Sequence, residues 1–166
     1  MAKVNSFDVS TGVDLQEVDN AVNQARKEVA QRYDFKGTDC KLVFDRGSAS
    51  VTLEADDSYR LQALKQVLRE KLAGRKVPLR NVEEGRLQEG AVGRARQVLE
   101  FTQGIDQDTG KRISKDIRDQ KYKKVQVQIQ GDELRVSAPS RDTLQEVISF
   151  LRAQDYGVEL NFGNYR

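Results

Sequence analysis

The second half of the sequence carries side chains that can hold phosphates and recognise bases. Arginine and lysine donate charge-assisted hydrogen bonds to phosphate oxygens, amides bind base edges, and tyrosine can stack on a base. Several of these residues alternate with apolar ones, as on the solvent face of a half-buried strand. The candidate nucleotide-binding residues are Arg94, Arg96, Lys124, Gln126, Gln128, Arg135, Asn161 and Tyr165.

These residue types predict different roles within one site. The roles are phosphate binding by Arg94, Arg96, Lys124 and Arg135, base-edge recognition by Gln126, Gln128 and Asn161, and stacking by Tyr165. Such a surface suits a nucleotide or an RNA strand. A polar sheet face can also serve only to prevent aggregation or to contact a neighbouring domain, and both interpretations remain open from composition.

The composition argues against several other functions. The chain has no histidine, which removes the commonest general base and metal ligand, and Cys40 is its one cysteine, so no zinc cluster, cofactor or disulfide is predicted. An enzyme is therefore disfavoured. The 28 basic and 26 acidic residues give a net charge of +2, so any basic site must be local. No apolar run resembles a signal peptide or membrane span, which predicts a cytoplasmic protein.

The elements that must position the candidate residues follow from periodicity. Val125, Val127 and Ile129 alternate with polar residues, and Leu134 and Val136 do the same after Gly131-Asp132. This pattern predicts a hairpin with a tight turn.

The whole chain repeats one order of elements, which is strand, helix, strand, strand, helix, strand. In the first half these elements are expected at residues 5–9, 15–32, 40–44, 49–53, 58–74 and 77–82. In the second half they are expected at residues 94–101, 106–122, 125–130, 133–137, 141–151 and 158–162. The predicted domains are therefore residues 1–82 and 94–166, and the glycine-containing segment 83–93 is predicted to be the linker.

The halves also agree in detail. Gly12-Val13-Asp14 corresponds to Gly104-Ile105-Asp106, and Asp57 and Ser140 occupy the same helix-capping position. We therefore predict an α+β fold, a tandem duplication of two ferredoxin-like βαββαβ domains. Each domain should have a four-stranded antiparallel sheet with two helices on one face, which leaves the other face free.

Other nucleic-acid motifs fit less well. The RNA-recognition motif has this topology, but its third strand carries aromatic residues, whereas Val51-Thr52-Leu53 and Leu134-Arg135-Val136 have none. Residues 90–93 have the GxxG pattern of a KH loop without the predicted flanking helices. Tyr33 and Phe35 could stack a base, although packing at the end of a helix is favoured.

Several segments, taken in order, resemble the bacterial YajQ family over almost the whole chain. These segments are Ser6-Phe7-Asp8-Val9, Val13-Asp14-Leu15-Gln16-Glu17, Tyr33-Asp34-Phe35-Lys36-Gly37, residues 126–136, Ser140-Arg141-Asp142 with Leu144-Gln145, and Phe162-Gly163-Asn164-Tyr165-Arg166.

The resemblance implies a nucleotide-binding protein without known catalysis, because some members are described as binding cyclic di-GMP as effectors and some are proposed to bind RNA. It also implies two ferredoxin-like domains that exchange their C-terminal strands. In that arrangement residues 77–82 would pair in the second sheet and residues 158–162 in the first. The candidate site residues come from their own chemistry and not from the resemblance.

The sequence thus predicts a non-enzymatic effector that binds cyclic di-GMP or another purine nucleotide resembling GTP or ATP, or else RNA. The alternative is a protein-interaction module, such as a transcription cofactor that binds a protein partner. Neither hypothesis involves a membrane or a metal.

Overall fold

A computed structural model describes residues 3–90 and 92–166 of the chain. The chain forms two compact units. One consists of residues up to Gly12 together with residues 103–166, and we call it the discontinuous unit. The other consists of residues 13–102, and we call it the continuous unit. Among the described residues, no helix has the length and apolar character needed to cross a membrane.

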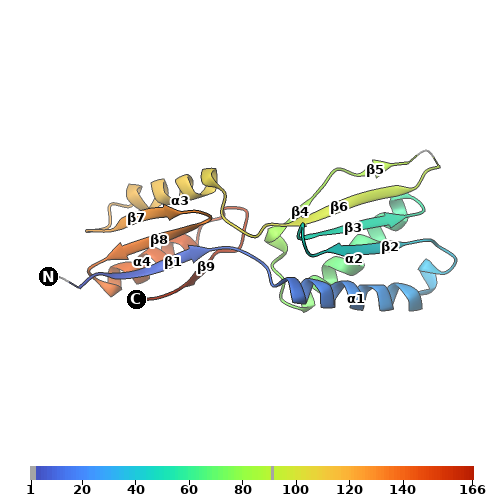
Figure 1. Ribbon diagram of the computed structural model, residues 1–166, viewed down its shortest axis with the longest axis horizontal. Coiled ribbons are helices and arrows are strands. Elements are labelled where there is room, and N and C mark those ends of the chain that lie inside the picture. Colours follow the sequence, from blue (N-terminus) through green and yellow to red (C-terminus); the bar gives the residue numbers. More distant parts are fainter. Residues whose placement is uncertain (1–2, 91) are drawn as a thin grey trace. The chain divides into compact units, whose positions relative to one another are not determined.

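The continuous unit has a sheet in the order β2-β3-β6-β4, with the short β5 also paired to β6 (Figure 1). Its helices bury an apolar stripe against this sheet, with Val18, Val22, Leu64 and Leu68 at the centre of the core. Its elements are α1 (Leu15–Gln31), η1 (Tyr33–Phe35), β2 (Lys41–Asp45), β3 (Ser50–Ala55), α2 (Ser58–Gly74), η2 (Leu79–Asn81), β4 (Val82–Glu84), β5 (Gln88–Glu89) and β6 (Ala95–Phe101).

The discontinuous unit has a four-stranded antiparallel sheet in the order β7-β8-β1-β9 (Figure 1). Phe7, Val9, Leu134 and Val136 point from this sheet into a core that both of its helices share. Its elements are β1 (Asn5–Ser10), α3 (Gln107–Asp119), β7 (Gln126–Gln130), β8 (Glu133–Ala138), α4 (Arg141–Arg152) and β9 (Asn161–Gly163).

The predicted α+β class and the ferredoxin-like organisation are confirmed. Each unit has two α-helices and an antiparallel sheet, and α1 and α4 begin where the sequence places their caps. The Asp14 carboxylate accepts a hydrogen bond from the Gln16 N–H at 2.9 Å, and the Ser140 hydroxyl accepts one from the Thr143 N–H at 3.3 Å. These bonds satisfy N–H groups that a helix leaves unpaired at its start.

The strands are exchanged between the halves in a different way from the one expected. β1 pairs with β8 and β9, whereas β6 pairs with β3 and β4. The N-terminal strands of the two halves are therefore exchanged, and the C-terminal strands stay with their own hairpins. The predicted boundaries at residues 1–82 and 94–166 do not coincide with the two units. Both first strands have the same alternation, so periodicity could not choose between their partners.

The segment 83–93 also differs from the predicted linker, because much of it is bonded to β6. Glu83 and Glu84 belong to β4, and the next residue, Gly85, donates its N–H to the Val98 carbonyl at 2.8 Å. A Cβ at Gly85 would lie 2.7 Å from that carbonyl oxygen. The glycine is thus needed for close approach to the sheet and not for flexibility. In place of the expected strand 77–82, residues 79–81 form η2, and a strand begins only at Val82.

Replacing Gly85 by alanine should lower the free energy of unfolding by about 1–3 kcal/mol, because the new methyl group must displace the Val98 carbonyl. Chemical denaturation followed by circular dichroism measures the change. Gly74→Ala is the matched control, because nothing lies within 4 Å of a Cβ there. Equal midpoints for the two variants would contradict the place of Gly85 in the sheet.

Candidate functional site

Four of the predicted residues share the open face of the sheet in the discontinuous unit. Gln126 and Gln128 of β7 lie opposite Ser137 and Arg135 of β8. Asn161 of β9 lies opposite Ser10, on the same face because cross-strand partners point to the same side. The helices cover the other face, so these amide, hydroxyl and guanidinium groups have access to solvent.

The guanidinium group of Arg135 is already paired on this face. Its Nε lies 3.0 Å from Oδ1 of Asp8, and Asn164 donates from Nδ2 to Oδ2 of Asp8 at 2.7 Å. Burial opposes ionisation of Asp8, but these bonds and the charges of Arg135 and Arg166 outweigh it and lower the pKa of Asp8. A phosphate that binds Arg135 must therefore compete with the ionised carboxylate of Asp8.

Arg94 and Arg96 belong to the continuous unit, whereas the other predicted residues belong to the discontinuous unit. Arg94 lies 3.3 Å from Asp39 and 3.2 Å from Asp56, and the Arg96 Nε lies 3.8 Å from Glu54. Arg94 thus has several carboxylates beside it and Arg96 has one, and these negative charges weaken the attraction of both arginines for a phosphate.

Lys124 lies at the entrance of β7, where it adopts a positive φ of 59°. With Gln126 and Ser137 it lines a hollow of about 410 Å³ that also includes the exposed Val4. Its amine takes part in no ion pair within the described ranges 3–90 and 92–166. Lys124 is therefore a free cation near the edge of the open face.

Tyr165 lies on the opposite side of the sheet from Arg135. The chain continues past β9 along β1, where Ser6 and Arg166 exchange main-chain hydrogen bonds of 3.2 and 3.0 Å. Because side chains alternate, Tyr165 points to the side of Phe7, and the two ring centroids are 6.4 Å apart. The structure thus separates the predicted stacking residue from the amides of the open face.

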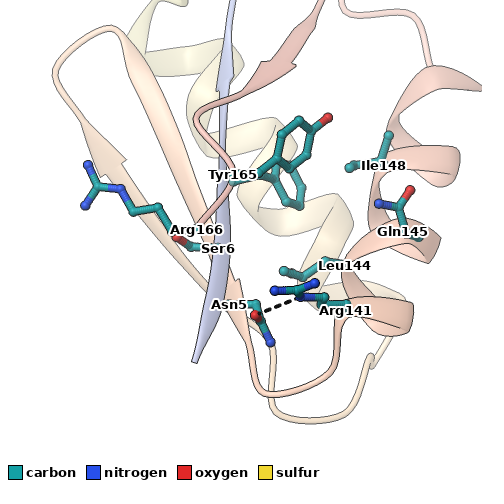
Figure 2. A pocket seen from close by; sticks show the side chains of 9 residues that line it. Asn5, Ser6, Arg141, Leu144, Gln145, Ile148, Tyr165 and Arg166 are labelled. Atoms are coloured by element: carbon teal, nitrogen blue, oxygen red, sulfur yellow. Dashed lines mark hydrogen bonds between the residues drawn. The ribbon is translucent and has the colours of Figure 1, made fainter. Parts of the chain in front are cut away.

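Tyr165 instead lines a cavity of about 290 Å³ between β1 and α4. Figure 2 shows its ring directed towards α4, where Ile148 and Gln145 face it, while the Arg166 side chain points away. The residues that line the cavity are Asn5, Ser6, Phe7, Arg141, Leu144, Gln145, Ile148, Tyr165 and Arg166.

The cavity combines an apolar interior with polar groups at its edge. The buried side chains of Leu144 and Ile148 form apolar surface, whereas the Tyr165 side chain is 60% exposed. Arg141 donates from Nε to Oδ1 of Asn5 at 3.2 Å, and Asn5 in turn donates to the Pro139 carbonyl at 2.9 Å. These two bonds hold the guanidinium group at the cavity.

The positive charge of the Arg141 guanidinium group is available to a ligand. Arg141 is the first residue of α4, where the unpaired N–H groups of the helix also favour an anion. Within the part of the chain that the structure describes, no carboxylate forms an ion pair with Arg141. The arrangement can therefore hold a planar ring against Tyr165 and an anion at Arg141.

The continuous unit has different chemistry at the corresponding place. Gln97 occupies the ladder position of Phe7, and Lys65 occupies the helix position of Ile148, eight residues after the cap. The Lys65 amine lies 3.2 Å from Gln97 and 2.7 Å from Glu84. A hydrogen-bonded polar cluster thus fills the space that apolar and aromatic groups line in the discontinuous unit.

The sequence prediction missed Arg141, Gln145 and Asn5. Arg141 and Gln145 are four residues apart, which places them on one face of α4, so this part of the site was detectable. Asn5 contacts Arg141 although the two residues are 136 positions apart in the sequence, so no local pattern could have joined them. Among residues 3–90 and 92–166, no group of three or more His, Cys, Asp or Glu side chains could hold a metal ion.

Comparison with known proteins places these features in a family. The family model described as "Nucleotide-binding protein YajQ-like" matches residues 5–166. Relatives named "Nucleotide-binding protein" occur in Alkaliphilus oremlandii and Desulfitobacterium hafniense, at 43% and 45% identity over the full length of both chains. Another in Saccharopolyspora erythraea is 46% identical, over 97% of this chain and 98% of that relative. These names describe binding and specify no reaction. The chain belongs to the YajQ family.

Proposed function

We propose that the protein binds nucleotides without transforming them, and that the cavity between β1 and α4 receives the base. The exposed ring of Tyr165 facing the apolar surface of α4, with Arg141 at the edge, is the observation that supports this function. The names of the relatives agree with the same class of ligand.

The base would stack on Tyr165 and contact Leu144 and Ile148 on its other side. Stacking favours the larger ring system of a purine, and the amides of Gln145 and Asn5 can bind its edge. The phosphate would bind Arg141 and the first N–H groups of α4. The cavity volume of about 290 Å³ is at the lower end for ligand sites, which suits one base.

A ligand with more than one base would extend beyond this cavity. A purine mononucleotide, one half of cyclic di-GMP or one end of an RNA strand can each present a base and a phosphate. The open-face residues Gln126, Gln128, Arg135 and Asn161 remain predicted contacts for such an extension, as does Lys124. The effector role that we propose requires the ligand to alter a further interaction of the protein.

Tyr165→Ala and Arg141→Ala should each weaken binding of GMP and cyclic di-GMP about tenfold, because each removes a stacking or phosphate contact. Tyr165→Phe should stay within about twofold of the natural protein, since the ring remains. Isothermal titration calorimetry at low salt measures these affinities, with AMP and a short RNA as further probes.

Tyr33→Ala and Arg118→Ala are matched controls, because both side chains are exposed and neither lines the cavity. If the cavity variants bind normally and Arg135→Ala abolishes binding, the site is on the open face and the cavity assignment is wrong.

Raising the salt concentration should weaken nucleotide binding, because the ionic contact between phosphate and guanidinium is screened. Guanosine, which has no phosphate, should bind more weakly and with little dependence on salt. Arg141→Ala should reduce the salt dependence for GMP. Titrations at salt concentrations from about 20 to 300 mM measure how steeply each affinity falls with salt. Over this range the Debye length falls from roughly 20 to 6 Å. Undetectable nucleotide binding at low salt would refute the proposed function.

A further inference from the structure

The segment that carries Tyr165 contains a β-bulge. Asp8 of β1 lies opposite the last residue of β9, and Ser6 of β1 is paired with Arg166 through two main-chain hydrogen bonds. One residue of β1 lies between these two pairs, whereas Asn164 and Tyr165 both lie between them on the other side. An extra residue of this kind bends the strand and changes the face to which the following side chains point.

The bulge determines which face of the sheet Tyr165 reaches. In a regular ladder Asn164 would lie opposite Phe7, and the next residue, Tyr165, would point to the open face. The extra residue shifts the pairing by one position, so Tyr165 points to the side of the helices. Figure 2 shows its ring directed towards α4, while the Arg166 side chain points away. The cavity therefore owes its exposed aromatic wall to the bulge.

The continuous unit contains the same bulge. There β4 ends opposite Leu99, and β5 begins opposite Arg96. Three residues separate β4 from β5, but two residues of β6 lie between their partners. Leu87 takes the place of Tyr165 in this bulge, and it packs against the apolar core of the unit. The bulge thus belongs to the topology that both units share, and in each unit it turns one side chain to the face that the helices cover.

A side-chain hydrogen bond secures each bulge, but the two bonds differ. In the continuous unit Gln97 donates from Nε2 to the Gly85 carbonyl at 2.8 Å. In the discontinuous unit Asn164 donates from Nδ2 to Oδ2 of Asp8 at 2.7 Å, and Nε of Arg135 lies 3.0 Å from the other carboxylate oxygen. Asn164 also has a positive φ of 53°, which asparagine tolerates better than most residues. Its backbone and its side chain therefore both favour the bulged pairing.

We propose that Asp8 and Asn164 position Tyr165 at the nucleotide cavity by fixing this bulge. Neither of their side chains lines the cavity, so both are positioning residues that act through the main chain. The Tyr165 ring has two further contacts, a hydroxyl bond of 3.3 Å to the Phe162 carbonyl and the Phe7 ring at 6.4 Å. Without the bond to Asp8, the segment can adopt the regular pairing, which turns Tyr165 to the open face. The role in binding rests on the proposed function, whereas the position of the ring is a property of the free protein.

Asn164→Asp should release Tyr165 from the cavity, because two carboxylates then repel each other where the amide was bonded. Aspartate has nearly the same shape and also tolerates a positive φ, so the backbone preference is kept. Nuclear Overhauser contacts between the rings of Tyr165 and Phe7 should disappear in the free protein, and the affinity for GMP should fall about tenfold, as for Tyr165→Ala. The exchanged variant D8N/N164D restores a donor opposite an acceptor, so the ring contacts should return and the affinity should recover to within about threefold. NMR spectroscopy and isothermal titration calorimetry measure these effects.

Asn23→Asp, the same change at an exposed position of α1, is the matched control and should leave both measurements unchanged. Circular dichroism establishes that each variant is folded. In a Tyr165→Ala background, Asn164→Asp should weaken GMP binding by no more than about a further twofold, because its effect passes through the ring.

The positioning role is wrong if Asn164→Asp keeps the ring contacts, if the exchanged variant does not restore them, or if the losses from Asn164→Asp and Tyr165→Ala add in full. A natural protein that binds no GMP would instead refute the proposed function, and the ring contacts of the free protein would still test the role of Asp8 and Asn164.

Discussion

The pairing of β1 between β8 and β9 is the constraint on which the discontinuous unit depends. This strand precedes the other strands of its sheet by more than ninety residues in the sequence. Its register places Phe7 opposite Val136 and Val9 opposite Phe162. The same ladder continues into the pairing of Ser6 with Arg166. Without β1, neither the core of this unit nor the wall of its cavity would be complete.

The two-residue period of β1 separates two kinds of chemistry. Asp8 points to the open face, where it holds Arg135 and Asn164, while Phe7 points to the helices and meets Tyr165. Charged pairs therefore gather on one side of the sheet and aromatic surface on the other. A ligand that needs both stacking and a cation finds them together next to α4, where Arg141 supplies the charge.

The two units share one backbone topology but carry different side chains at equivalent positions. The cluster of Lys65, Gln97 and Glu84 satisfies its own polar groups in the continuous unit. Phe7 and Ile148 occupy the matching places in the discontinuous unit and leave room beside Tyr165. The function that we propose therefore depends on side chains placed on a common fold and does not follow from the fold itself.

Local sequence patterns determined the helices, their caps at Asp14 and Ser140, the hairpin around Gly131, and the faces of the strands. Such signals depend on residues a few positions apart. Only the tertiary structure decided that β1 and β6 exchange sheets, because both strands alternate alike. That choice also placed Tyr165 on the opposite side from Arg135 and assigned Arg94 to the other unit. Periodicity determines which way a side chain points, but main-chain pairing determines what it meets.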